Sequence, residues 1–130
     1  MRRNYIITAA IFGGLAVAFG AFGAHGLERI TTDEKILHSF QTGVQYQIYH
    51  ALALLAVAIL FENFSSHRFI WAANCFIAGI ILFSGSLYLL TFLKIQGSNA
   101  VRFIGPITPV GGLFFIAGWL FLLLAAVKKK

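Results

Sequence analysis

Seven polar side chains in this sequence could carry chemistry, and each lies within or beside a long apolar stretch: His25, Gln47, His50, Ser84, Ser86, Tyr88 and Thr108. Imidazoles can ligate a haem iron, and an imidazole can serve as a base toward a serine hydroxyl. Gln47 and His50 are three residues apart, so on a helix they share one face. The sequence has no HExxH motif, nucleophile elbow or carboxylate pair within an apolar stretch. We therefore assign no catalytic residue and no metal ligand, and expect binding rather than catalysis.

The composition identifies the medium in which these residues lie. The chain has 130 residues, of which 59% are hydrophobic and 11% charged, and its mean hydropathy is +0.85. A soluble protein of this size has too little interior to bury so much apolar surface. Cys75, the single cysteine, can form neither an intrachain disulfide nor a CxxC metal pair. The sequence predicts a membrane protein.

The apolar runs predict an all-α fold with four transmembrane helices, since about 20 apolar residues span a bilayer as a helix. Their limits are about 5–25, 44–61, 69–93 and 106–127, and we expect one domain covering residues 1–130. An amphipathic interfacial helix is predicted at about 32–43, where Thr32 could cap its start. This helix could run straight into the second span or bend at Gly43.

The first span has two features of its own. Its start resembles a secretory signal with Ala21-Phe22-Gly23 as a cleavage site, but its apolar run is longer than a signal's, which favours retention. Small residues recur along it every three to four positions: Ala9, Gly13, Ala16, Gly20 and Ala24. Such faces allow close helix approach in lipid. They predict a homo-oligomer that forms through small-residue helix faces.

The basic residues indicate topology rather than nucleic-acid binding, because they are scattered at the ends of spans and do not line one face. Four spans place both termini on one side of the membrane. That side would hold Arg2, Arg3, Arg68 and Lys128–Lys130, against Arg29, Lys35, Lys94 and Arg102 opposite. Cytoplasmic loops carry the excess of Lys and Arg. We therefore expect both termini in the cytoplasm.

This topology brings the polar residues to a common depth, in the outer half of the membrane. Unpaired polar groups are costly in hydrocarbon, so they should face one another or an outward-open cavity. The predicted ligand-binding residues of this single cluster are His25, Tyr46, Gln47, His50, Ser84, Ser86, Tyr88 and Thr108. A structural interpretation remains open: intramembrane polar groups often bond neighbouring helices, and tyrosines near span ends often anchor a helix at the interface.

Four segments carry a resemblance to a known family: Gly20–Leu27, Thr42–Leu54, Phe83–Tyr88 and Gly105–Gly112. With these motifs the chain resembles the small membrane proteins of the domain-of-unknown-function 423 family, whose eukaryotic branch is called transmembrane protein 256. Val110 stands where isoleucine is more familiar, and the loop Lys94–Phe103 is a little longer than usual. The resemblance implies an uncleaved, four-span, multi-pass protein of the bacterial inner (plasma) membrane. It implies no activity.

Several functions remain open at this point. The leading hypothesis is a non-enzymatic protein of the lipid bilayer that binds or passes a small or lipidic molecule as an oligomer, with no cofactor. A structural or assembly role is the alternative. A redox protein with haem or quinone would use His25 and His50, and a hydrolase would pair one of them with Ser84 or Ser86. All four acidic residues lie outside the spans, which argues against a proton-coupled multidrug exporter.

Overall fold

The computed structural model describes residues 2–63 and 66–127 and contains no strand among them. Helix α1 (Arg2–Ala21) continues through the short turns η1 (Phe22–Gly26) and η2 (Leu27–Arg29). Helix α2 (Glu34–Leu60) follows, and α3 (His67–Gly79), η3 (Ile80–Ser84) and α4 (Gly85–Gln96) form one further rod. The short α5 (Val101–Ile104) precedes α6 (Ile107–Val127). Four helical rods are therefore long and apolar enough to cross a membrane, which confirms the predicted fold class.

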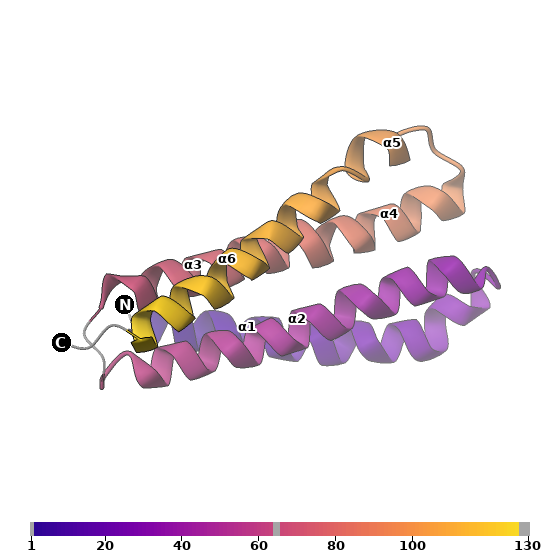
Figure 1. Ribbon diagram of the computed structural model, residues 1–130. Helices are drawn as coiled ribbons and strands as arrows, with labels where there is room; N and C mark the ends of the chain where they lie inside the picture. Colours follow the sequence, from indigo (N-terminus) through magenta and orange to yellow (C-terminus); the bar gives the residue numbers. More distant parts are fainter. Residues whose placement is uncertain (1, 64–65, 128–130) are drawn as a thin grey trace.

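The rods run alternately up and down, so both described ends of the chain lie at the same end of the bundle (Figure 1). There Arg2 forms an ion pair with Glu62 and donates from Nε to the carbonyl of Ala58 at 3.1 Å. Arg68 donates to the carbonyl of Leu124 at 3.2 Å. Both carbonyls lie in the last turn of their helices, α2 and α6, where the arginines supply hydrogen-bond donors. The lysines 128–130, which contribute to the topology prediction, lie outside the described residues.

Helix α2 begins slightly later than the sequence indicated and continues through Gly43. Asp33, not Thr32, caps it by accepting a hydrogen bond from the amide of Lys35 at 2.9 Å. The segment expected as an interfacial helix forms the first turns of α2, so of the two arrangements left open the chain adopts the one that runs straight into the second span. Gly43 is buried at the crossing with α4, where an added Cβ would lie 3.0 Å from the ring of Tyr88. The glycine therefore serves a helix contact rather than a bend.

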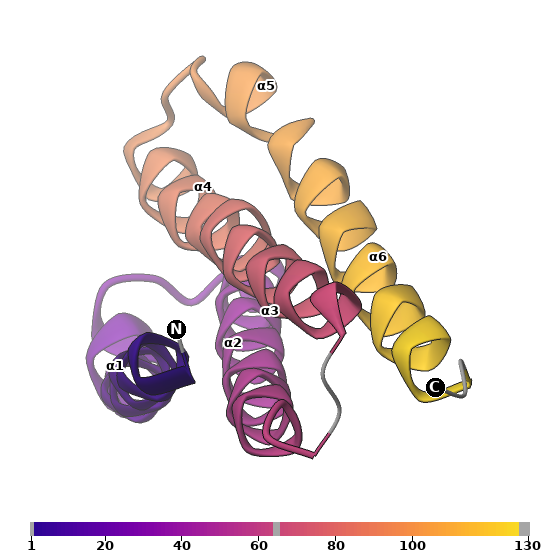
Figure 2. The ribbon, with the colours of Figure 1, turned by 90° about the vertical axis from the view of Figure 1, so that its left-hand side faces the viewer.

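Two layers make up the bundle. Helices α1 and α2 lie side by side, and α3–α4 packs against α6, with α1 and α6 on opposite sides (Figure 2). The small-residue face of α1 is used inside the chain: Ala9 and Ala16 are buried, and Gly20 lies against Val44 of α2. The α6 side relies on glycine contacts as well. An added Cβ at Gly118 would lie 2.6 Å from the Phe76 ring, and one at Gly111 would lie 2.3 Å from the backbone nitrogen of Phe83.

The third rod is not a uniform α-helix. In η3 the amide of Gly85 bonds the carbonyl of Ile80, five residues back, so this turn contains one residue more than an α-helical turn. Gly97 ends the rod at φ 68°, a left-handed conformation that glycine adopts without steric cost. The amide of Ser98 bonds the carbonyl of Leu93 across this turn, which completes a Schellman motif.

Candidate functional site

Gln47 is the middle residue of α2 and joins three helices. Its side chain is only 3% exposed. Nε2 donates to the carbonyl of Phe12 on α1 at 2.8 Å, and Oε1 accepts from the hydroxyl of Tyr88 on α4 at 2.6 Å. Both ends of the amide are therefore satisfied within the chain. An amide in an apolar interior is stable only with such partners.

His50, one turn further along α2, is held between α2 and α6. Its Nδ1 lies 2.8 Å from the carbonyl of Tyr46, and the indole Nε1 of Trp119 donates to its Nε2 at 3.0 Å. Because an indole only donates and a carbonyl only accepts, the imidazole is neutral and carries its proton on Nδ1. The ring also stacks on Phe115, with centroids 3.6 Å apart. His50 has no free nitrogen in this arrangement.

The three small hydroxyls connect helices in the same way. Ser84 Oγ donates to the carbonyl of Gly43 at 2.6 Å and is completely buried. Ser86 Oγ donates to the carbonyl of Phe83 at 2.8 Å and lies 2.5 Å from the hydroxyl of Thr108 on α6. These bonds join α2 to η3 and α4 to α6.

The predicted single cluster is thus divided into separate hydrogen-bonded sets. His25 belongs to none of them: it lies exposed on η1, near the end of the first rod. Tyr46 is 38% exposed and contacts Phe83 through its ring, with centroids 4.8 Å apart, while its carbonyl serves His50. Every buried side-chain nitrogen or oxygen in the described residues has a hydrogen-bond partner. The location of these residues in the outer half of the membrane stays a prediction.

Sequence reasoning missed Trp119, as well as the phenylalanines of the pocket described below. Trp119 lies in the predominantly apolar α6, where tryptophan is easily assigned to the lipid-facing surface. A signal was available, because an indole N–H within a span requires an acceptor, and His50 and Gln47 are among the side-chain acceptors that the spans offer.

The geometry does not suit the redox or hydrolytic alternatives. Phe22 and Gly23, beside His25, contact Phe40, which precedes His50 by ten residues, or about 15 Å along a helix. The two imidazoles therefore do not face each other as axial ligands of one haem would. Neither Ser84 nor Ser86 bonds a histidine. No group of three or more metal-binding side chains occurs among residues 2–63 and 66–127.

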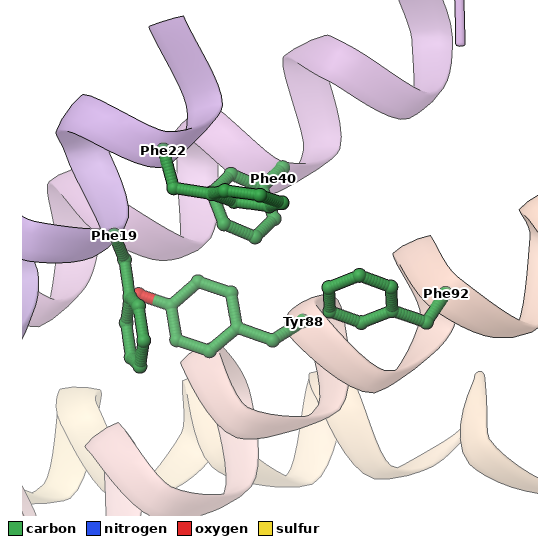
Figure 3. A pocket seen from close by; sticks show the side chains of 5 residues that line it. All are labelled: Phe19, Phe22, Phe40, Tyr88 and Phe92. Carbon is green, nitrogen blue, oxygen red and sulfur yellow. The ribbon is translucent and has the colours of Figure 1, made fainter. Parts of the chain in front are cut away.

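An aromatic pocket lies next to the Gln47 network. It has a volume of about 360 Å³ and is lined by five rings, drawn in Figure 3: Phe19, Phe22, Phe40, Tyr88 and Phe92. The rings come from α1, η1, α2 and α4. Phe19 and Tyr88 meet edge to face at 5.0 Å, and Phe22 and Phe40 do so at 5.9 Å. Tyr88 belongs to both structures, because its ring lines the pocket while its hydroxyl bonds Gln47.

A second, open depression lies at the same end of the bundle and is polar. Its volume is about 660 Å³, and it is lined by Glu34, Lys35, His38, Ser39 and Lys94. The depression lies between the first turns of α2 and the last turn of α4. Its mixed charges are typical of a solvated helix end.

The four apolar rods and the satisfied intramembrane polar groups define an integral membrane protein. Comparison with known proteins identifies its family. The family described as "Protein of unknown function (DUF423)" matches residues 19–112, and the chain belongs to it. No solved structure matches.

Named relatives cover nearly the whole chain. The UPF0382 membrane protein YwdK of Bacillus subtilis (strain 168) is 47% identical over 127 residues, which are 97% of this chain and 98% of that protein. The UPF0382 inner membrane protein YgdD of Escherichia coli (strain K12) is 40% identical over 128 residues, 98% and 92% of the two chains. The UPF0382 membrane protein SH2409 of Staphylococcus haemolyticus is 40% identical over 126 residues, 97% of each. The resemblance noted in the sequence is confirmed.

Proposed function

We propose that the protein is a non-enzymatic membrane protein that binds a lipidic molecule in the aromatic pocket. One observation carries this proposal: a cavity of about 360 Å³ lined by the rings of Phe19, Phe22, Phe40, Tyr88 and Phe92. Small-molecule sites typically have volumes of about 300–1,000 Å³ and predominantly apolar walls. The part of the ligand that enters is apolar, such as an acyl or isoprenoid chain.

The polar residues support the pocket rather than line it. Tyr88 is the one predicted ligand-binding residue in the wall, and Gln47 fixes its ring through the 2.6 Å hydrogen bond. His50, Ser84, Ser86 and Thr108 use their polar atoms within the chain. We assign these four to helix packing, and His25 to the solvated end of the first rod.

We further propose that the chain is a single domain with both termini in the cytoplasm. The bonds of Gln47 and His50 across α1, α2, α4 and α6 support one cooperative unit. In the sequence, six basic residues on the side of the termini (Arg2, Arg3, Arg68 and Lys128–Lys130) against four on the other side support the orientation.

Native mass spectrometry after gentle extraction from the membrane tests the binding. Phe92→Ala removes a half-exposed ring from the pocket wall, and Phe114→Ala on α6 removes a ring of similar exposure elsewhere. We expect a co-purifying molecule that is lost or reduced in Phe92→Ala and retained in Phe114→Ala. Equal occupancy in the two variants would contradict the pocket as its site.

A structural or assembly role is the second candidate, favoured by the complete satisfaction of the described buried polar groups. It predicts a ligand-free protein in the same experiment. Phe92→Ala would then leave the mass spectrum unchanged apart from the substitution itself.

A further inference from the structure

The face of α2 that points away from the bundle carries polar groups without partners. Gln41, Gln45 and Tyr49 are exposed on it, Tyr49 to 55%. Among residues 2–63 and 66–127, no hydrogen bond involves the side-chain polar atoms of any of these three. The buried face of the same helix has all its polar groups paired.

Two of these groups, Tyr49 and Gln45, lie within the predicted second span, where lipid cannot satisfy them. Leu60 ends α2 close to the charged pair Arg2–Glu62. Counted from Leu60, Tyr49 and Gln45 lie about 17 and 22 Å along the helix, within a hydrocarbon core of ~30 Å. Acyl chains offer no hydrogen bonds, so exposed amides and phenols there are costly. Their partner has to be another polar surface.

The spacing of the exposed residues identifies the shape of that surface. Five exposed positions recur at alternating intervals of four and three residues: Gln45, Tyr49, Leu52, Ala56 and Ile59. This is the a/d pattern of two helices that pack side by side in a left-handed pair. We call these five residues the α2 seam. Such pairs in membranes are joined by small residues and interhelical hydrogen bonds, and the seam offers both.

We propose that the α2 seam binds the α2 seam of a second copy of this chain, in a parallel pair about a two-fold axis. Glutamine and tyrosine side chains each donate and accept hydrogen bonds, so the surface is complementary to itself, as a two-fold interface requires. Three of the five small residues of α1, the surface predicted from sequence, are used within the chain: Ala9 and Ala16 are buried, and Gly20 lies against Val44 of α2. The α2 seam is therefore the alternative surface through which two copies could pair.

Cysteine cross-linking in native membranes tests the pairing, in a Cys75→Ser background. Leu52→Cys places a thiol on the seam, and Ile11→Cys places one on α1 at similar exposure and a similar distance from the charged end. We expect disulfide-linked dimers at position 52 and few at position 11. Equal yields at both positions, or none at position 52, would overturn the proposal.

A second variant tests the polar groups themselves. Gln45→Leu with Tyr49→Phe removes the unpartnered amide and phenol but keeps an apolar seam, so folding of the monomer is preserved. Cross-linking at position 52 should fall on the order of tenfold, because interhelical hydrogen bonds contribute to the association of helices in membranes. Tyr5→Phe removes a phenol already bonded to Asn74 and should leave the yield unchanged. A monomeric native mass for the parent protein, or an unchanged yield in the double variant, would refute the pairing.

Discussion

The polar residues of the spans differ in what their hydrogen bonds do. Gln47 satisfies both ends of its amide with groups from two other helices, and Ser84 bonds a carbonyl of α2. Ser86 bonds the carbonyl of Phe83 in its own rod as well as Thr108 on α6. The loss of an interhelical bond leaves a partner unsatisfied in an apolar interior, which costs more than the bond itself contributes. Predictions for single residues therefore concern the polar groups that a substitution would leave without a hydrogen-bond partner.

Tyr88→Phe should lower the free energy of unfolding by about 1–3 kcal/mol, because it leaves the buried Oε1 of Gln47 without a donor. The double variant Gln47→Leu, Tyr88→Phe should cost less than the sum of the two single changes. Denaturant titration in micelles measures both. Tyr5→Phe, whose hydroxyl bonds Asn74 at the surface, serves as the control and should have a smaller effect. Strict additivity in the cycle would contradict a coupled Gln47–Tyr88 pair.

His50→Leu should change the environment of Trp119, since it removes the acceptor at 3.0 Å from the indole. In a Trp71→Phe background, the fluorescence of Trp119 reports this directly. We expect a shifted emission and a destabilisation of about 1–3 kcal/mol from the unpaired indole. An unchanged emission maximum would show that the indole does not bond His50.

At the scale of elements, glycine positions decide how closely α6 approaches the third rod. Gly111→Ala would place a Cβ 2.3 Å from the backbone of Phe83, which cannot move aside as a side chain could. We expect a loss of about 1–3 kcal/mol in stability, typical of overpacking. In Gly85→Ala, on the third rod, the added Cβ meets nothing within 4 Å, so this variant should be neutral or slightly stabilising. Thermal unfolding of the two variants makes the comparison, and equal melting temperatures would contradict the close crossing.

The elements were largely predictable from the sequence, and the contacts were not. Hydropathy over twenty residues identifies a span whichever neighbour it meets, so the four rods were found. The division of the polar cluster depends on which face of each rod meets which partner, and a bonded Trp119 looks like a lipid-facing one in sequence. The continuity of α2 through Gly43 was left open, because the sequence does not distinguish a glycine at which a helix bends from a glycine at which a second helix packs closely.

At the scale of the whole molecule, the alternating rods place the loops at two opposite ends. Ser66 precedes α3 at the end that holds Arg2, and Ser98 follows α4 at the other. With cytoplasmic termini, a membrane-impermeant maleimide should label Ser98→Cys in intact spheroplasts and Ser66→Cys only after permeabilisation. The Cys75→Ser background removes the native thiol. The reverse pattern would establish the opposite orientation.

The extra residue in η3 lets one rod serve two different partners. Along a uniform helix each residue turns the side chains by about 100°, so a face aligned with α6 in α3 would continue in a fixed direction through α4. The wide turn at Ile80–Ser84 resets this angular phase, and the rod presents Phe76 to α6 but Ser84 and Tyr88 to α2. A single-residue deletion between Ile80 and Ser84 would therefore return this turn to α-helical length and leave Tyr88 directed at Gln47. Closing the wide turn into a uniform α-helix without a deletion would instead rotate the half beyond it by about 100° and direct Tyr88 away from Gln47.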